Sequence, residues 1–177
     1  NLWKDIDINP NDFNSAVYEF YYQKTIQRLK NYCSKFSATI EDQAVFINDY
    51  YCEPVKDLLQ AVFDKDCLQG IPSTYHGDLH SDNTIVIPEG YTLIDWRHAF
   101  GSLVECGDRY YDLAKFLHTL ELSVETMDTK KYTLTNKADY YYINHECSFV
   151  LNDARQAFKD FVTKFGYSEL IIEIINS

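Results

Sequence analysis

Two short β-branched runs joined by a turn interrupt a sequence whose other regular segments are helical, and this interruption constrains the fold most. The first run is Thr84-Ile85-Val86-Ile87, the turn is Pro88-Glu89-Gly90, and the second run is Tyr91-Thr92-Leu93-Ile94. Runs of β-branched and aromatic residues that flank a Pro and Gly turn are typical of a β-hairpin. The sequence therefore predicts one hairpin set between helical regions.

Helical spacing governs the segments that precede the hairpin. Apolar and aromatic residues recur at this spacing over residues 11–32, with Asp12 or Asn14 as the expected cap, and again over residues 42–51. A further helix is expected to open at Pro54 and to stop at Gly70, because proline suits the first turn of a helix. Three helices are thus predicted before the first chemical motif.

Helical patterns also follow the hairpin. Asp108 is expected to cap a helix that carries Leu113, Phe116, Leu117 and Leu120, since a carboxylate can accept the free N–H groups of a first turn. Two further helices are predicted over residues 137–165 and 168–175. The expected fold class is α+β, mostly α, with residues 1–177 as one lobe.

Charge and cysteine usage exclude several classes of protein. The net charge of −11 disfavours nucleic acid and anionic membranes as partners, because both require clustered Lys and Arg. No apolar run approaches the roughly 18 residues that a membrane span needs. The five cysteines are odd in number and form no CxxC pair, so neither a disulfide framework nor a zinc site is indicated. A reducing cytoplasm is the expected location.

A polar loop at residues 76–83 directly precedes the hairpin, and the second strand ends in Ile94-Asp95-Trp96. Phosphoryl transfer needs a carboxylate that accepts the hydroxyl proton, and oxygen ligands that hold magnesium against nucleotide phosphates. Asp78 is suited to the first task, and Asn83 and Asp95 to the second. The step from Asp78 to Asn83 equals that in the catalytic loop of protein kinases. The hairpin should bring Asp95 back beside Asn83.

Three blocks in this region resemble the C-terminal lobe of the aminoglycoside phosphotransferase and choline kinase families. They are His-Gly-Asp-Leu-His-x-x-Asn at residues 76–83, Ile-Asp-Trp at 94–96, and Gly-Asp-x-x-Tyr-Asp-Leu-Ala at 107–114. Residues 94–97 and 110–115 further resemble a kinase-like branch encoded among capsule and nucleotide-sugar genes. The resemblance implies the C-terminal lobe of a protein-kinase-like fold, with a small catalytic β-hairpin.

The same resemblance implies roles for individual residues. It makes Asp78 the catalytic base and Asn83 and Asp95 the ligands of Mg²⁺. It also makes His76 a support of the catalytic loop, and Asp108 a tether between that loop and the following helix.

Two more residues are candidates for contact with phosphate or substrate. His80 has loop packing as its alternative role, and Arg97 has a structural ion pair, although its guanidinium matches the geometry of a phosphate or carboxylate. The aromatic run 140–142 is interpreted as helix core, with an acceptor pocket as the alternative. Cys106 is interpreted as a small hydrophobic residue.

The residues upstream of the loop depart from the family pattern. They contain no Gly-rich loop, no strand-borne Lys and no partner Glu, and the chain has six Gly in total. Because the chain does not begin with Met, we expect the nucleotide lobe to belong to a longer parent protein and to be missing here. The lysine and the magnesium site must both be in place for transfer, so the isolated chain is expected to be inactive or nearly so.

The expected activity of the parent protein is phosphorylation of a hydroxyl group on a small-molecule acceptor, with Mg²⁺ and ATP or another NTP. A sugar or sugar-like capsule precursor is the first expectation for the acceptor, and an amino alcohol or aminoglycoside the next.

Two other classes of function are open from the sequence. A metallophosphoesterase would use Asp78 and His80 as its DxH block, Asp108 as its GD block, and Asn144 with His145 in an NHE block. Against this reading, no histidine follows His145 to complete a two-metal site. A pseudokinase would retain the motif as architecture only.

Overall fold

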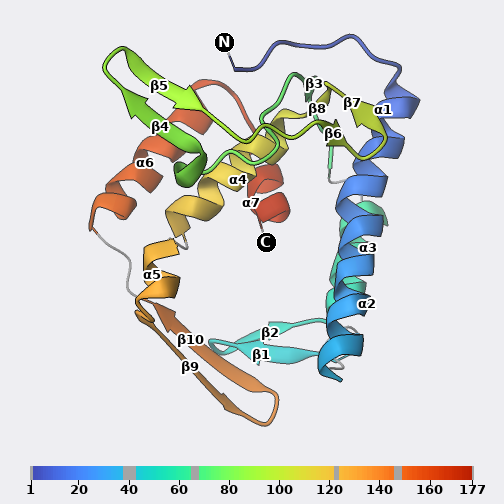
Figure 1. Ribbon diagram of the computed structural model, residues 1–177. Helices are drawn as coiled ribbons and strands as arrows, with labels where there is room; N and C mark the ends of the chain where they lie inside the picture. The colour runs from blue at the N-terminus through green and yellow to red at the C-terminus, as the bar shows by residue number, and fades with distance from the viewer. Residues whose placement is uncertain (1, 38–42, 65–67, 122–123, 146–148, 177) are drawn as a thin grey trace. The chain divides into compact units, whose positions relative to one another are not determined.

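The computed structural model describes residues 2–37, 43–64, 68–121, 124–145 and 149–176, which form two compact units (Figure 1). Unit 1 comprises Asn1–Glu19, Gln69–Ser123 and Cys147–Ser177, and unit 2 comprises Phe20–Leu68 and Val124–Glu146. The loop and hairpin expected to carry the chemistry therefore lie in unit 1. That the two units together make the single lobe expected from the sequence stays a prediction.

Three helices form the main core of unit 1. They are α4 (Arg109–Glu121), α6 (Phe149–Lys164) and α7 (Glu169–Asn176). Their buried side chains pack as one cluster: Tyr110, Leu113, Ala114, Leu117, Leu120, Phe158, Val162 and Ile172. Burial of this apolar surface is the main stabilising contribution to such a unit.

The predicted starts of α4 and α7 are confirmed by their caps. Asp108 Oδ1 accepts the backbone N–H of Tyr110 at 3.0 Å, and Ser168 Oγ accepts that of Ile171 at 3.3 Å. These side chains satisfy N–H groups that have no partner within the helix.

The predicted hairpin of unit 1 is also confirmed. Strands β4 (Thr84–Ile87) and β5 (Gly90–Leu93) are antiparallel, with Thr84 opposite Leu93. Two shorter antiparallel pairs accompany it. Strand β3 (Pro72–Ser73) pairs with β8 (Gly107–Asp108), and β6 (Ala99–Phe100) pairs with β7 (Leu103–Val104).

Helix α1 (Pro10–Val17) contributes a second apolar cluster to unit 1. The rings of Phe13 and Phe100 stack with their centroids 6.5 Å apart, and Tyr75 meets Phe100 edge-on at 6.0 Å. Helical residues continue from α1 through a π-helical stretch, Tyr18–Gln23, into α2 (Lys24–Phe36). The helix predicted over residues 11–32 is therefore confirmed and is longer at both ends. Its expected cap is wrong, because Asn9, and not Asp12 or Asn14, caps it: Asn9 Oδ1 accepts the N–H of Asn11 at 2.9 Å.

Unit 2 contains a four-stranded sheet in the order β2-β1-β10-β9, in addition to α2. Its strands are β1 (Val45–Ile47), β2 (Tyr50–Cys52), β9 (Tyr132–Lys137) and β10 (Tyr140–His145), and β1 runs parallel to β10. Helices α3 (Val55–Asp64) and α5 (Val124–Asp128) complete the unit. The helix expected from Pro54 is confirmed as α3, although it ends before Gly70.

Two helix predictions that fall in this sheet are wrong. Of the described residues in 42–51, Val45–Ile47 form β1, 48–49 a turn and 50–51 the start of β2. Of the described residues in 137–165, only 149–164 are helical, as α6. Phe46 and Tyr140 explain the difference, because their rings stack at 4.5 Å across the β1–β10 pair. Contact between segments so distant in sequence overrides local helical spacing.

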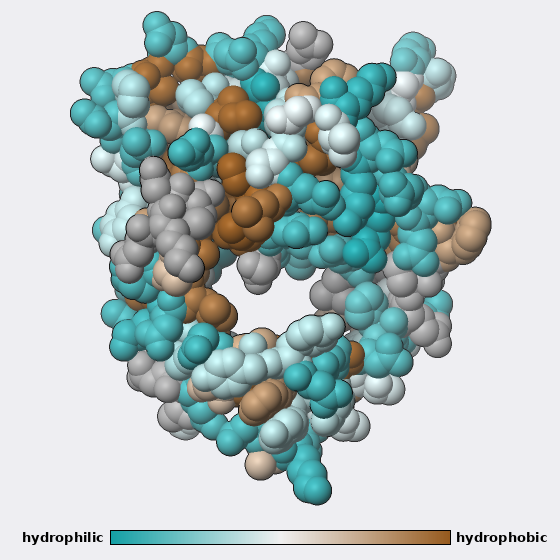
Figure 2. Space-filling view, turned by 180° about the vertical axis from the view of Figure 1, so that it is seen from behind, coloured by the Kyte–Doolittle hydropathy of each residue, from teal (hydrophilic) through white to brown (hydrophobic). Residues whose placement is uncertain are grey.

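The surface seen from behind is mostly hydrophilic, with hydrophobic residues in separate patches (Figure 2). No described helix is both long and apolar enough to cross a membrane.

Two buried tyrosines of unit 1 give a test of this packing. Tyr110 OH accepts the backbone N–H of Ser168 at 3.0 Å, whereas Tyr75 OH has no hydrogen-bond partner among the described residues. A buried hydroxyl group without a hydrogen-bond partner destabilises the folded state, and one with a partner stabilises it. We expect Tyr110→Phe to lower the free energy of unfolding by about 1 kcal/mol, and Tyr75→Phe to leave it unchanged or raise it.

Urea denaturation of both variants beside the native chain measures these differences. An equal loss of stability in Tyr75→Phe and Tyr110→Phe would contradict the expectation.

Candidate active site

The loop at residues 76–83 is attached to α4 by the buried carboxylate of Asp112. Its two oxygens accept the backbone N–H groups of His76 and Gly77, each at 2.7 Å, and Oδ2 also accepts the indole N–H of Trp3 at 2.9 Å. Burial raises the pKa of Asp112, and these donated hydrogen bonds oppose that shift. Asp112 therefore fixes the start of the loop to α4 and to the N-terminal segment.

Asp112 makes a tether between the loop and α4, and the tether expected from Asp108 stays a prediction. Asp108 is 1% exposed, and its Oδ1 accepts the N–H groups of Ile71 at 2.9 Å and Tyr110 at 3.0 Å. These two contacts tie the start of α4 to the segment before β3. The signal for Asp112 was its place in the 107–114 block, one helical turn beyond Asp108.

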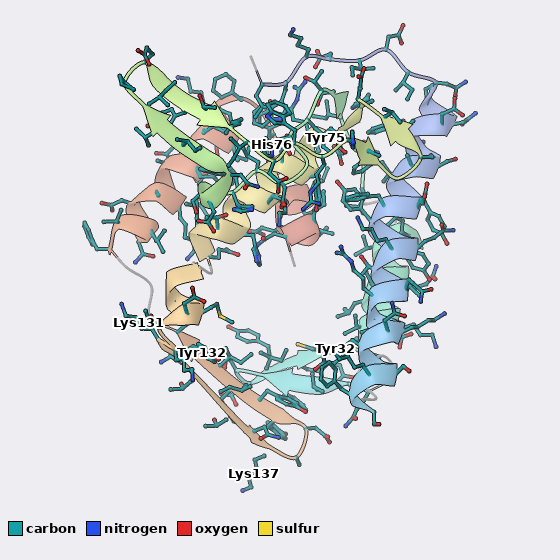
Figure 3. The ribbon with its side chains drawn as sticks, in the orientation of Figure 1. Tyr32, Tyr75, His76, Lys131, Tyr132 and Lys137 are labelled. Carbon is teal, nitrogen blue, oxygen red and sulfur yellow. The ribbon has the colours of Figure 1, made fainter. Side chains whose placement is uncertain are left out.

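The side chain of His76 joins the loop to the end of the hairpin (Figure 3). Its Nδ1 accepts the backbone N–H of Asp78 at 3.2 Å, so the ring proton is on Nε2, which donates to the carbonyl of Ile94 at 2.8 Å. The ring is completely buried and lies 4.9 Å from that of Trp96. These are the contacts of a residue that supports the loop.

Backbone hydrogen bonds hold Asp95 next to the loop. The N–H of Ile94 donates to Asn83 at 3.0 Å, and the N–H of Arg97 donates to His76 at 2.8 Å. Asp95 lies between these bonds, is exposed, and has a φ of 61°. A left-handed backbone is uncommon for residues other than glycine, and such outliers cluster at functional sites.

Asn83 has its amide orientation fixed by the same loop. Its Nδ2 donates to the carbonyl of Asp78 at 3.0 Å and lies 3.1 Å from His80 Nε2. The carbonyl requires a donor there, so Oδ1 is the atom left for a ligand. An amide oxygen and a carboxylate are ligands that Mg²⁺ accepts, so Asn83 and Asp95 fit this ion by their chemistry.

Among the described residues, no group of three or more His, Cys, Asp or Glu side chains could hold a metal ion. This does not bear on Mg²⁺, which is usually held by one or two protein ligands together with substrate phosphates.

Asp78 is held between two cations. Arg97 Nη2 lies 2.6 Å from its Oδ2, and Lys115 Nζ lies 3.1 Å from its Oδ1. Burial opposes the charge of this carboxyl, but hydrogen bonds from Arg97 and Lys115 outweigh burial and lower its pKa. Lys115 was not among the residues predicted for the site, although it follows Asp112 by three positions and so lies on the same side of the helix.

His80 lies at the edge of this group. Its Nε2 is 3.9 Å from Asp78 Oδ1, and its Nδ1 is 4.0 Å from Asp82 Oδ2. The imidazole therefore packs among loop residues and remains partly exposed.

An apolar pocket of about 720 Å³ adjoins the loop at Leu79, the residue after Asp78. All of its lining residues belong to unit 1: Leu2, Trp3, Leu79, Thr84, Tyr91, Leu93, Leu113, Phe116, Ala154, Ala157, Phe158 and Phe161. Its volume is in the range of small-molecule sites.

The remaining candidates from the sequence lie elsewhere. Asn144 and His145 belong to β10 of unit 2, and Glu146 lies outside the described residues. The aromatic run 140–142 lies in β10, so it belongs to a strand and not to the core of a helix. Tyr142 OH donates to Asp49 Oδ1 at 2.8 Å. Cys106 is 5% exposed and burial raises its pKa, which agrees with a small hydrophobic residue.

The comparisons with known proteins add no further likeness. The chain matches no protein-family model and no curated protein. The resemblance to small-molecule kinases therefore depends on the loop, the hairpin and the start of α4.

The anchoring role of Asp112 predicts a large loss of stability in Asp112→Asn. An amide has one acceptor oxygen, so at least one of the three bound N–H groups loses its acceptor in the protein interior. We expect the free energy of unfolding to fall by about 3 kcal/mol.

Asp82→Asn is the matched control, because the Asp82 side chain is 58% exposed in the same loop. Its free energy of unfolding, measured by urea denaturation, should stay within about 0.5 kcal/mol of that of the native chain. Equal unfolding midpoints for the two variants would refute the anchoring role.

Proposed function

We propose that this chain supplies the catalytic loop of a kinase that transfers a phosphoryl group from ATP, or another NTP, to a hydroxyl group of a small molecule. The observation that supports the proposal is the hydrogen bonding of Asn83, which donates to the carbonyl of Asp78 and accepts the N–H of Ile94, the neighbour of Asp95. His76 and Asp112 hold the backbone of that loop through buried hydrogen bonds.

Asp78 is proposed as the catalytic base. Its carboxylate would orient the acceptor hydroxyl and take its proton as the oxygen bonds to the γ-phosphorus of ATP, while the bond from that phosphorus to the bridging oxygen breaks and ADP leaves. Most of the catalysis in phosphoryl transfer comes from positioning and charge stabilisation, so the main task of this carboxylate is to position the hydroxyl group. The bond from its own N–H to His76 fixes the position of Asp78 in the loop.

Asn83 and Asp95 are proposed to hold Mg²⁺, which when bound neutralises charge on the nucleotide phosphates. The fixed amide of Asn83 presents Oδ1, and the exposed carboxylate of Asp95 stands on the hairpin side. Asp95 has a left-handed backbone, which Asp adopts more readily than most residues other than glycine.

The proposals for the nucleotide lobe, the location and the acceptor are those expected from the sequence. The parent protein is proposed to supply the nucleotide lobe and to act in the cytoplasm, with a sugar or sugar-like acceptor. Turnover by the isolated chain is not expected, so metal binding is the first test.

Mn²⁺ is a paramagnetic substitute for Mg²⁺ that reports the metal site directly. We expect Mn²⁺ with ATP to broaden amide NMR signals of residues 76–96, and Asp95→Asn to abolish this broadening. Asn also tolerates a left-handed backbone, so this variant should unfold within about 0.5 kcal/mol of the native chain.

Asp82→Asn is the matched control, because it also removes one carboxylate from this region. The broadening should persist in this variant. Broadening that persists unchanged in Asp95→Asn would remove the metal site from the proposal.

Transfer itself is measured with labelled ATP in the parent protein. We expect Asp78→Asn to lower kcat by about 10²- to 10⁴-fold, the usual contribution of a general base, with little change in the KM for ATP. A native kcat in Asp78→Asn would show that Asp78 is not the base.

A further inference from the structure

Two cations converge on the proposed base in a chain whose net charge is −11. Arg97 pairs with one oxygen of Asp78, and Lys115 pairs with the other. The three side chains together carry a charge of +1 next to the loop. The carboxylate of Asp95 also interacts with Arg97, and the cationic groups of Arg97 and Lys115 lie where the acceptor hydroxyl would have to bind.

Arg97 is built into the loop and is more than a loosely placed surface residue. Gly77 has a φ of +82°, and a Cβ there would lie 2.5 Å from Arg97 Cβ and 2.8 Å from its Cγ. Only glycine allows this close approach, and the N–H of Arg97 is bonded to His76 in addition. The stem of Arg97 is therefore fixed, while 57% of its side chain stays exposed.

Lys115 is positioned by the helix that anchors the loop. It follows Asp112 by three positions in α4, so one helix holds both the loop backbone and this ammonium group. Its side chain is 30% exposed, compared with 14% for Asp78. Solvent therefore reaches both cations more readily than the carboxylate between them.

This arrangement conflicts with the action of a base. A carboxylate whose two oxygens are both engaged by cations is a poor acceptor for a hydroxyl proton, because the charge it would use is already neutralised. An anion that binds the two cations would release the carboxylate. The nucleotide phosphates are assigned to the metal held by Asn83 and Asp95, which leaves this pair for the acceptor.

We propose that the acceptor carries an anionic group, a phosphate or a carboxylate, which binds between Arg97 and Lys115 and takes these cations from Asp78. The proposal rests on the kinase function above and narrows its substrate class to anionic small molecules such as sugar phosphates or sugar acids. The planar guanidinium of Arg97 matches both groups with paired hydrogen bonds.

The test is an NMR titration of the arginine Nε–H and lysine signals in the chain, without metal and at constant ionic strength. The probes are glucose 6-phosphate, glucuronate, neutral glucose and ADP. We expect saturable shifts of Arg97 and Lys115 with glucose 6-phosphate or glucuronate, and none with glucose. In Arg97→Gln the affinity should fall about tenfold, as for the loss of a charge-assisted hydrogen bond.

Arg155→Gln is the matched control, because Arg155 also forms an ion pair, with Glu121 at 3.1 Å, and is part of unit 1. It should bind like the native chain. Arg97→Lys keeps the charge without the planar fork and should bind with intermediate affinity, which separates loss of the site from a general loss of folding.

Three results would overturn the proposal: no shift with either anionic sugar, equal shifts with glucose, or native affinity in Arg97→Gln. Shifts with ADP alone would show that Arg97 and Lys115 bind the nucleotide, and would also overturn the proposal. Because no metal is present, failure here is distinguishable from failure of the Mn²⁺ test at Asp95.

Discussion

The buried carboxylate of Asp112 is the interaction on which the organisation of unit 1 depends. Three N–H groups from two distant segments donate to it, so α4, the loop at residues 76–83 and Trp3 meet at one point. Such a group is tolerated in the interior only when hydrogen bonds replace its lost hydration. The same bonds give the loop a fixed starting point on a packed helix, which a surface loop would otherwise lack.

From that point the loop geometry propagates to the hairpin. His76 bonds to the backbone on both sides of the loop, and the hairpin returns Asp95 to the side of Asn83. The completely buried imidazole and its fixed tautomer leave the loop little freedom. A site that needs oxygen atoms in fixed places is best built on such a supported segment. The strained backbone of Asp95 is tolerated because the bonds on either side of it determine its position.

Two cationic side chains surround Asp78, although the chain as a whole is acidic. Arg97 and Lys115 hold its carboxylate ionised, and the resulting ion pairs occupy the oxygens that a base must offer. The proposed anionic acceptor resolves this conflict, since its own charge would replace that of Asp78. Binding of the correct acceptor would then also activate the base. A neutral molecule would not free Asp78, so transfer to it would be disfavoured.

The sequence by itself determined the hairpin at residues 84–93, the cap at Asp108 and the spacing of Asp78, Asn83 and Asp95. Turn residues, helix caps and motif spacing act over a few positions. The sheet of unit 2 was not determined in this way, since β1 and β10 form strands only by pairing with each other across about ninety residues. The assignment of the loop anchor to Asp112, and the approach of Lys115 to Asp78, were likewise decided by tertiary structure. Which side chain on a helix faces a loop depends on how the two pack, and packing joins residues that no local pattern connects.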